Sequence, residues 1–330
     1  MKFCYLFISL LILSVPVCAQ NELRFDKNRK FKIVQIADIH YIADNDGCSS
    51  VLPALQRILN TETPDLVIFT GDLIYGKPAG KSISEVLQMV SDHKIPFGIT
   101  FGNHDDEFGM SRQELYDLTK NIPYNLTSTT EGLTGVTNYI LPVKSSVSDS
   151  SAFVIYVFDS NAYSKIENLG GYDHIHFDQI AWYRKNSLLY RKNNGGNAVP
   201  SFAFFHIPLP EYNTAASDET AILTGTRMEK ACASGLNSGL FLSMKEMGDV
   251  LATFAGHDHD NDYAVNYNNI MLAYGRFSGC NTVYNNLKPL GVRVIELSEG
   301  SGSFRTWIRL NGGRIVNDIQ CPDFFMKGKN

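Results

Sequence analysis

Chemically reactive side chains directly follow short apolar runs at five places in this chain, and this arrangement limits the folds it can adopt. The run 31–37 precedes Asp38 and His40, and the run 65–70 precedes Asp72. Three more apolar runs precede Asn103-His104-Asp105, His206, and His257 with His259. Strands that alternate with helices predict a largely parallel α/β sheet, whose strands end at one shared edge. We therefore expect these side chains to share one site.

The remaining elements follow from apolar periodicity. Helices are expected over 51–59, 83–93 and 178–191, and strands over 31–37, 65–70, 96–100, 152–158 and 201–205. Later strands are expected over 251–255, 270–273, 291–297 and 303–310, at short spacings that suggest antiparallel pairing. The segment 211–239 lacks clear periodicity and is too long for a neutral connection, so we expect it to cover or shape a site. Without a linker or repeat, residues 20–330 are expected to form one domain.

Composition excludes two classes of protein. With 44% hydrophobic residues, the chain can bury a core, which excludes a disordered protein. Twenty-nine Lys and Arg stand against 34 Asp and Glu, for a net charge of −5. We therefore expect no surface that binds nucleic acid through its phosphates.

The first 19 residues are expected to be a signal peptide. Lys2 precedes an apolar run, 3–17, that is too short to span a bilayer, and Val17-Cys18-Ala19 offers a cleavage site. The alternative, a lipid on Cys18, is disfavoured because Val17 stands where a small residue is needed. We expect an exported protein, periplasmic or secreted, that begins at Gln20. No other apolar run is long enough to cross a membrane.

Four cysteines would remain after cleavage: Cys48, Cys232, Cys280 and Cys321. In an oxidising compartment they allow three complete pairings, among which the sequence does not choose. No Cys-x-x-Cys occurs, so a zinc ribbon or a thioredoxin-like site is not supported.

The reactive side chains suit a pair of metal ions. Carboxylate, amide and imidazole donors without thiolates favour Zn, Mn, Fe or similar ions. The two-residue spacing of Asp38 and His40 aims both side chains to one side of an extended tip, as it does for His257 and His259. Asp72 is the natural bridge between two cations about 3.5–4 Å apart, an arrangement suited to in-line attack on phosphorus.

Five blocks in this order resemble the calcineurin-like metallophosphoesterases. They are Asp38-Ile-His40, Gly71-Asp-Leu-Ile74, Gly102-Asn-His-Asp105, His206 after a strand, and Gly256-His-Asp-His259. The longer strings 206–212 and 256–262, with 291–297 and 306–310, are similar to the purple-acid-phosphatase-like branch. The resemblance implies an α/β fold of four layers, in which two mixed β-sheets pack as a sandwich flanked by helices.

The resemblance also implies a role for each residue. The first metal ion would take Asp38, His40, Asp72 and His259, and the second would take Asp72, Asn103, His206 and His257. His104 would be the acid that protonates the leaving oxygen or steadies the phosphoryl group, and Asp105 would hold its ring. The expected cofactors are two divalent or Fe-type ions (Mn, Zn or Fe), and a metal-bridging hydroxide would attack phosphorus.

The expected function is hydrolysis of a small-molecule or surface phosphate ester, with monoesters preferred because the branch resemblance points there. Phosphodiester hydrolysis is the alternative with the same metal pair. A binding protein with a decayed site is a third hypothesis, which the complete set of ligand positions opposes.

Other residues are weaker candidates. Tyr75 occupies the place of the tyrosinate that colours true purple enzymes, but His40 already completes the first ligand set. Tyr75 is therefore interpreted as pocket wall or hydrogen-bond donor, and a non-purple metal pair is expected. Arg276 could grip a phosphate oxygen or form a surface salt bridge, and Glu211 should line the pocket. His174 and His176 could bind metal, although a helix cap or surface polarity is the favoured interpretation.

Overall fold

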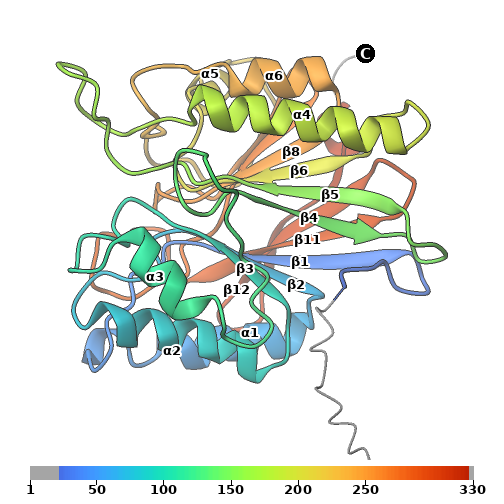
Figure 1. Ribbon diagram of the computed structural model, residues 1–330. Coiled ribbons are helices and arrows are strands. Elements are labelled where there is room, and N and C mark those ends of the chain that lie inside the picture. The colour runs from blue at the N-terminus through green and yellow to red at the C-terminus, as the bar shows by residue number, and fades with distance from the viewer. Residues whose placement is uncertain (1–21, 327–330) are drawn as a thin grey trace, which may run out of the picture.

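The computed structural model describes residues 22–326, and it has two β-sheets that pack face to face (Figure 1). Helices α1, α2 and α3 cover the outer face of one sheet, and α4, α5 and α6 lie on the outer side of the other (Figure 1). The predicted four-layer α/β fold is therefore confirmed. The predicted signal peptide, residues 1–19, lies outside the described residues.

The first sheet has six strands in the order β13-β12-β11-β1-β2-β3. Their bounds are β1 Lys30–Ile36, β2 Leu66–Thr70, β3 Phe97–Thr100, β11 Gly291–Ser298, β12 Phe304–Leu310 and β13 Ile315–Cys321. On its outer side lie α1 Val51–Glu62, α2 Ala79–Asp92 and α3 Arg112–Thr119. Strand β1 runs parallel to β2 and antiparallel to β11, so the sheet is mixed.

The second sheet has seven strands in the order β4-β5-β6-β8-β10-β9-β7. Their bounds are β4 Tyr139–Lys144, β5 Ser151–Val157, β6 Ser201–Phe204, β7 Leu223–Thr224, β8 Val250–Ala255, β9 Ala264–Tyr267 and β10 Ile270–Tyr274. Its helices are α4 Phe177–Asn193, α5 Glu211–Ala216 and α6 Leu240–Met247, and two short 3₁₀ turns span Asp46–Cys48 and Asp323–Met326. Strand β8 pairs in parallel with β6 and β10, so the antiparallel prediction for 251–255 was wrong.

Three apolar clusters join the four layers. One lies between the sheets and includes Ile33, Ile68 and Phe254. A second joins the first sheet to α1 and α2, and a third joins the second sheet to α4 and α6. Both faces of each sheet are therefore buried near the centre, which leaves strand ends and loops as the places for polar chemistry.

Helix α1 shows why these segments form as they do. Val51, Leu55, Ile58 and Leu59 recur on one side of the helix and are buried against the sheet. Helix α3 is short and instead begins with a capping box, in which Ser111 and Glu114 each accept a hydrogen bond from the other's backbone.

One disulfide, Cys48–Cys280, joins the loop after β1 to the loop after β10. Cys232 is exposed and Cys321 is buried, and neither forms a disulfide within residues 22–326. The cysteines thus form one pair, whereas the sequence allowed three complete pairings.

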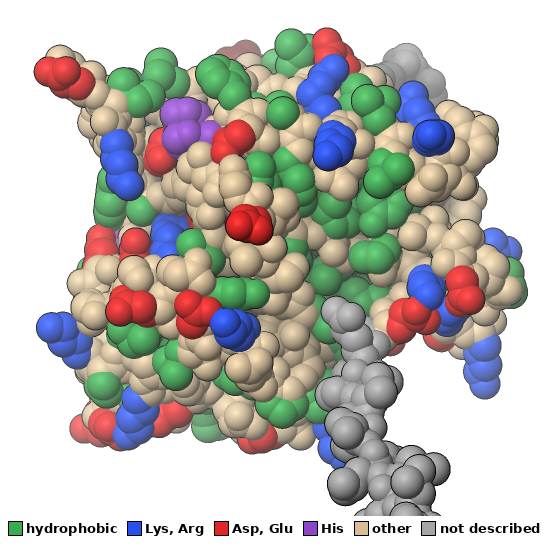
Figure 2. Space-filling model, in the orientation of Figure 1, with side chains coloured by type: hydrophobic (Ala, Val, Ile, Leu, Met, Phe, Trp, Pro, Cys, Tyr) green, Lys and Arg blue, Asp and Glu red, His purple; other side chains and the backbone are tan. Residues whose placement is uncertain are grey.

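On the face shown in Figure 2, acidic and basic side chains are interspersed. Among the described residues, no helix has the length and apolar character needed to cross a membrane.

Candidate metal centre

The polar tips that follow β1, β2, β6 and β8 bring their side chains into two groups of donors. The first group is Asp38, His40, Asp72 and His259, and the second is Asp72, His206 and His257. Within each group, one donor atom per residue lies within 4.8 Å of the others. Asp72 belongs to both groups and therefore stands where a bridging carboxylate was predicted.

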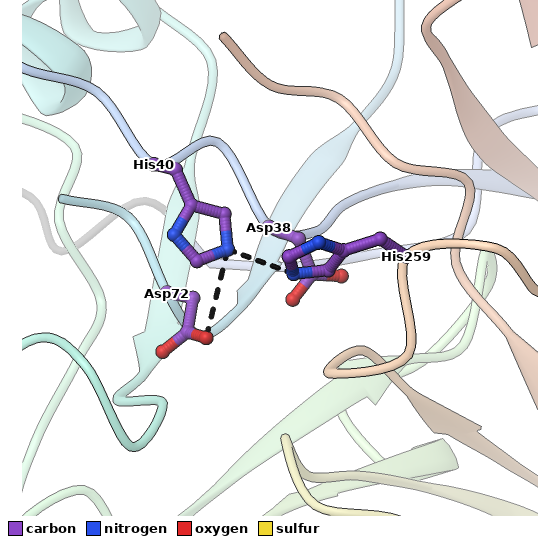
Figure 3. Close-up of side chains that lie close together, drawn as sticks. All are labelled: Asp38, His40, Asp72 and His259. Carbon is purple, nitrogen blue, oxygen red and sulfur yellow. Dashed lines mark hydrogen bonds and ion pairs between the residues drawn. The ribbon is translucent and has the colours of Figure 1, made fainter. Parts of the chain in front are cut away.

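The first group converges on the Nε2 atom of His40 (Figure 3). This atom lies 2.9 Å from His259 Nε2 and 3.7 Å from Asp72 Oδ2. Asp38 completes the group, and its Oδ1 accepts a hydrogen bond from the backbone N–H of His257 at 2.8 Å. That bond ties the tip after β1 to the tip after β8.

The second group converges on the Nε2 atom of His206. Asp72 Oδ2 lies 3.3 Å from it, Asn103 Oδ1 lies 3.1 Å from it and His257 Nδ1 lies 3.2 Å from it. The amide oxygen of Asn103, which follows β3, therefore lies with the second group, as the ligand prediction requires.

Backbone carbonyls hold two of the rings so that one nitrogen faces the centre. His206 Nδ1 lies 2.8 Å from the carbonyl of Thr70, and His259 Nδ1 lies 2.8 Å from the carbonyl of Tyr284. A carbonyl only accepts, so each Nδ1 carries hydrogen, and in a neutral ring the inward Nε2 is left with a lone pair. Metal-binding histidines are commonly oriented in this way.

The centre favours positive charge. Burial raises the pKa of the Asp38 carboxyl to about 8. Burial alone would lower the pKa of His206, but Asp72 and Asp38 outweigh it and raise that pKa to about 9. In addition, the buried atoms His40 Nδ1 and His257 Nε2 have no hydrogen-bond partner among the described residues. Ring lone pairs and carboxylates that crowd together in this way fit cations, whose binding displaces the protons held by groups such as Asp38 and His206.

Four of the candidate ligands have a left-handed backbone. The φ angles are +57° at Asp38, +49° at His40, +51° at Asp72 and +81° at His257. Such conformations cost about 1–3 kcal/mol each in residues other than glycine and cluster at functional sites. The strained tips therefore support a functional role for these four side chains.

Close packing of Gly102 against Asp72 leads to a prediction. A Cβ atom on Gly102 would lie 2.1 Å from Asp72 Oδ1 and 2.4 Å from the Asp72 nitrogen. Gly102→Ala should therefore displace Asp72 and lower both metal content and kcat by about 10–100-fold, the scale for disturbing the support of a metal ligand. Metal analysis and steady-state kinetics would measure this.

The matched control is Gly235→Ala, whose new Cβ would meet only Leu169 Cδ1 at an ordinary 3.5 Å. That variant should keep its metals and its kcat. A Gly102→Ala protein that behaves like the control would contradict the packing argument.

His104 lies beside the donors without joining either group. Its backbone N–H donates to Asp72 Oδ1 at 2.9 Å, and its ring packs edge-on against His40 and Tyr75. The ring nitrogen Nδ1 lies 2.7 Å from Glu107 Oε2. This position agrees with a residue that acts near the metal ions without binding them.

The predicted role of Asp105 was wrong. Its buried carboxylate accepts hydrogen bonds from the backbone N–H groups of Asp72, Leu73, Ile74 and Gly102 at 2.7–3.2 Å. It holds the tip that carries Asp72, and Glu107 is the residue that orients His104. Within residues 22–326, no hydrogen bond joins the Asp105 carboxylate to the adjacent His104 ring.

The predicted role of Arg276 was also wrong. Arg276 is buried, with its NH1 2.7 Å from Asp262 Oδ2, and its other donors bond to the carbonyls of Leu287 and Pro289. Its guanidinium is paired with groups inside the protein, so it neither binds a phosphate oxygen nor forms a surface salt bridge.

Tyr75 and Glu211 have different surroundings. Tyr75 packs edge-on against His40, His104 and Phe108, which suits pocket wall. Glu211 begins α5, and its Oε1 accepts a hydrogen bond from Asn237 at 2.7 Å, so its pocket role stays a prediction.

The segment 211–239 supports the loop that carries His257 and His259. Glu229 Oε1 accepts a hydrogen bond from the backbone N–H of Asp260, and Cys232 donates its N–H to the Asp258 carboxylate. The segment thus shapes the centre through the loop that carries two of its histidines, as expected of a segment that covers or shapes a site.

Sequence reasoning missed several residues around the centre. Tyr284 stacks on His259 with ring centroids 4.4 Å apart, and Tyr172 packs edge-on against His257 at 4.3 Å. The hydroxyl of Tyr163 donates to Glu107, which in turn holds His104. These residues lie in loops without periodicity, so no sequence signal marked them.

Comparison with known proteins identifies what the chain resembles. Residues 31–261 match the family described as calcineurin-like phosphoesterase. The chain is 33% identical over 294 residues to "Probable inactive purple acid phosphatase 29" of Arabidopsis thaliana, covering 79% of this chain and 75% of that protein. It is also 33% identical over 330 residues to "Phosphatase DCR2" of Saccharomyces cerevisiae, covering 88% of this chain and 56% of that protein.

Two solved structures share the fold. A dimetal phosphatase from Danio rerio has a TM-score of 0.61 at 14% identity, covering 88% of this chain and 98% of that one. The purple acid phosphatase PPD1 from yellow lupin has a TM-score of 0.53 at 12% identity, covering 88% of this chain and 53% of that one. At these identities the likeness shows the architecture alone.

Proposed function

We propose, from the premise that this chain belongs to the calcineurin-like phosphoesterase family and is a hydrolase of phosphoester bonds, that it hydrolyses phosphate monoesters at a centre of two metal ions. The observation that carries the proposal is the pair of donor groups that share Asp72. The substrate would be a small-molecule or surface phosphate ester.

Asp38, His40, Asp72 and His259 would hold one ion, and Asp72, Asn103, His206 and His257 would hold the other. Two cations held there would polarise the phosphoryl oxygens and lower the pKa of water, which makes a nucleophile available at neutral pH. The donor set, with oxygen and imidazole but no thiolate, suits Mn, Zn or Fe.

The chain's own residues would handle the proton of the leaving group. His104 stands beside Asp72 and is 27% exposed at its side chain, so its ring can reach a bound ester. Glu107 contacts Nδ1 and would leave Nε2 free to give a proton to the leaving oxygen. Asp105 would keep Asp72 in place through its backbone hydrogen bonds.

The preference for monoesters draws support from the phosphatase names of the relatives. The test is steady-state kinetics on p-nitrophenyl phosphate and bis-p-nitrophenyl phosphate with Mn²⁺, Zn²⁺ or Fe²⁺ added to metal-free protein. We expect turnover to require metal and kcat/KM to be larger for the monoester. A larger value for the diester would make the protein a phosphodiesterase with the same centre.

The word inactive in the names of three relatives from Arabidopsis thaliana makes the non-catalytic alternative concrete. Metal bound at both sites of the centre with no hydrolysis of either ester would favour a binding protein over an enzyme. The complete donor set of this chain favours turnover.

We propose further that the protein is exported, and the disulfide Cys48–Cys280 supports this because disulfides persist in oxidising compartments. The intact mass of protein recovered from native export should correspond to a chain that starts at Gln20, with one disulfide. A mass that includes Met1, or a lipid on Cys18, would contradict the proposal.

A further inference from the structure

A second cluster of metal-binding side chains precedes helix α4, in the run Asp173-His174-Ile175-His176. Its residues are Asp173, His174 and His176, and one donor atom from each lies within 4.8 Å of the others. We propose that this cluster binds an additional divalent metal ion, with Zn²⁺ as the ion that suits it best. The proposal concerns metal binding alone and holds whether or not the protein hydrolyses esters.

The Asp173 carboxylate stands between the two imidazoles. Its Oδ1 lies 3.1 Å from His174 Nδ1 and its Oδ2 lies 3.1 Å from His176 Nε2. The two rings stack in parallel, 4.4 Å apart at 6°. In a tetrahedral zinc site with bonds of 2.0–2.2 Å, neighbouring ligand atoms lie about 3.4 Å apart, and both carboxylate–imidazole distances are close to this value. Because a ring nitrogen binds a metal ion near the plane of its ring, one of the stacked imidazoles would turn about its side-chain bonds when the ion binds.

One ring nitrogen of the cluster has no hydrogen-bond partner among the described residues. His174 Nδ1 is buried, and among residues 22–326 it has no hydrogen-bond partner, because its approach to Asp173 lacks hydrogen-bond geometry. Asp173 is also buried, at 7% exposure, and histidines are its neighbours on both oxygens. A buried carboxylate and an unused imidazole nitrogen would both be satisfied by a cation.

Backbone contacts fix the position of the cluster. The Asp173 N–H donates to the carbonyl of Ala162, and Asn161 Nδ2 donates to the carbonyl of His174. His176 is the N-cap residue of α4, as the capping interpretation predicted, but its backbone N–H donates to Gln179 Oε1 and its ring bonds to Asp173. A cation bound between the His176 ring and Asp173 would replace that one hydrogen bond and leave the backbone contacts in place.

The surroundings allow an ion to enter. Asp173 and His176 line a cavity of about 720 Å³ that also reaches Asn103, Glu107 and Tyr163. Asp178 lies in the first turn of α4, where its charge balances the partial positive charge of the helix terminus. Two imidazoles and one carboxylate leave a coordination position for water or a ligand oxygen, as in zinc sites with three protein ligands.

The test counts bound Zn²⁺ per chain in full-length protein after equilibration with the ion and gel filtration. The wild type should hold three ions, and His176→Ala and Asp173→Asn should each hold two. Loss of one ligand should weaken Zn²⁺ binding at this site by more than about 100-fold, since loss of a mere supporting group already weakens metal binding 10–100-fold. His93→Ala, at the C-terminus of α2, is the matched histidine control and should hold three.

The Asp72→Asn variant, which should lose the ions of the centre, allows the additional site to be tested independently of the proposed function. In that background the additional ion should remain, and Co²⁺ bound there should give the visible absorption of a four-coordinate site that His176→Gln abolishes. Circular dichroism of the variants would show that each is folded. Equal metal content in folded wild type, His176→Ala and His176→Gln would overturn the proposal and leave the cluster as a helix cap.

Discussion

Asp72→Asn should reduce kcat by at least about 10³-fold and lower the content of both metal ions at the centre. The reason is that one buried carboxylate belongs to both donor groups, and its Oδ2 lies 3.3 Å from His206 and 3.7 Å from His40. Metal ions supply several kcal/mol of transition-state stabilisation, and each 1.36 kcal/mol corresponds to about a tenfold change in rate. Metal analysis and single-turnover kinetics would measure both effects.

Asp117→Asn is the matched control, since Asp117 is exposed and pairs only with neighbours on α3. It should leave activity and metal content unchanged. An Asp72→Asn protein that retains both ions of the centre and full activity would refute the bridging assignment.

His104→Ala should keep both ions and lose about 10²–10⁴-fold in rate on esters with poor leaving groups, the scale for a positioned acid. The loss should be much smaller for p-nitrophenyl phosphate, because nitrophenolate departs without a proton. Kinetics on an alkyl and an aryl phosphate, together with metal analysis, would measure the contrast.

Two outcomes would change the assignment of His104. Loss of a metal ion would make it a ligand, and an equal loss of rate on both esters would mean that it positions the phosphoryl group. Glu107→Gln should show the same leaving-group pattern with a smaller loss of about 10–100-fold, because Glu107 orients the ring without touching the substrate.

The fold was predictable where apolar strands end in polar tips. The expected strands over 31–37 and 65–70 correspond to β1 Lys30–Ile36 and β2 Leu66–Thr70, because continuous apolar runs can be buried only inside a covered sheet. The pairing partners were less predictable. Strand β8 pairs in parallel with β10 although only a short segment separates them, because β9 intervenes as the antiparallel partner of β10.

Some strands carry weak periodicity and escaped prediction. Strand β4 contains Pro142 and lies at the edge of its sheet, where a missing N–H is tolerated. Strand β9 turns into β10 at Asn268-Asn269, where both residues have positive φ, as a type I′ hairpin requires. The two adjacent asparagines are the sequence feature from which this hairpin could have been predicted.

The site was predictable at the residues that bear donor atoms and not at those that support them. Asp38, His40 and Asp72 follow strands directly, so the order of the strands in the sheet brings them to one edge. The errors at Asp105 and Arg276 have another cause, because the direction of each side chain depends on how a whole loop folds. A carboxylate next to a histidine in sequence is not thereby next to it in space.

The pairing of β1 with β11 and the bond Cys48–Cys280 determine when the centre can first exist. A ribosome makes Cys280 232 residues after Cys48, and the backbone N–H of Cys280 and the hydroxyl of Thr282 then donate to the carbonyls of Ile39 and His40. Until then the tip with Asp38 and His40 lacks these two hydrogen bonds. A growing chain therefore lacks these two contacts, and the proposed ion sites would first be complete in the compartment where the finished chain folds.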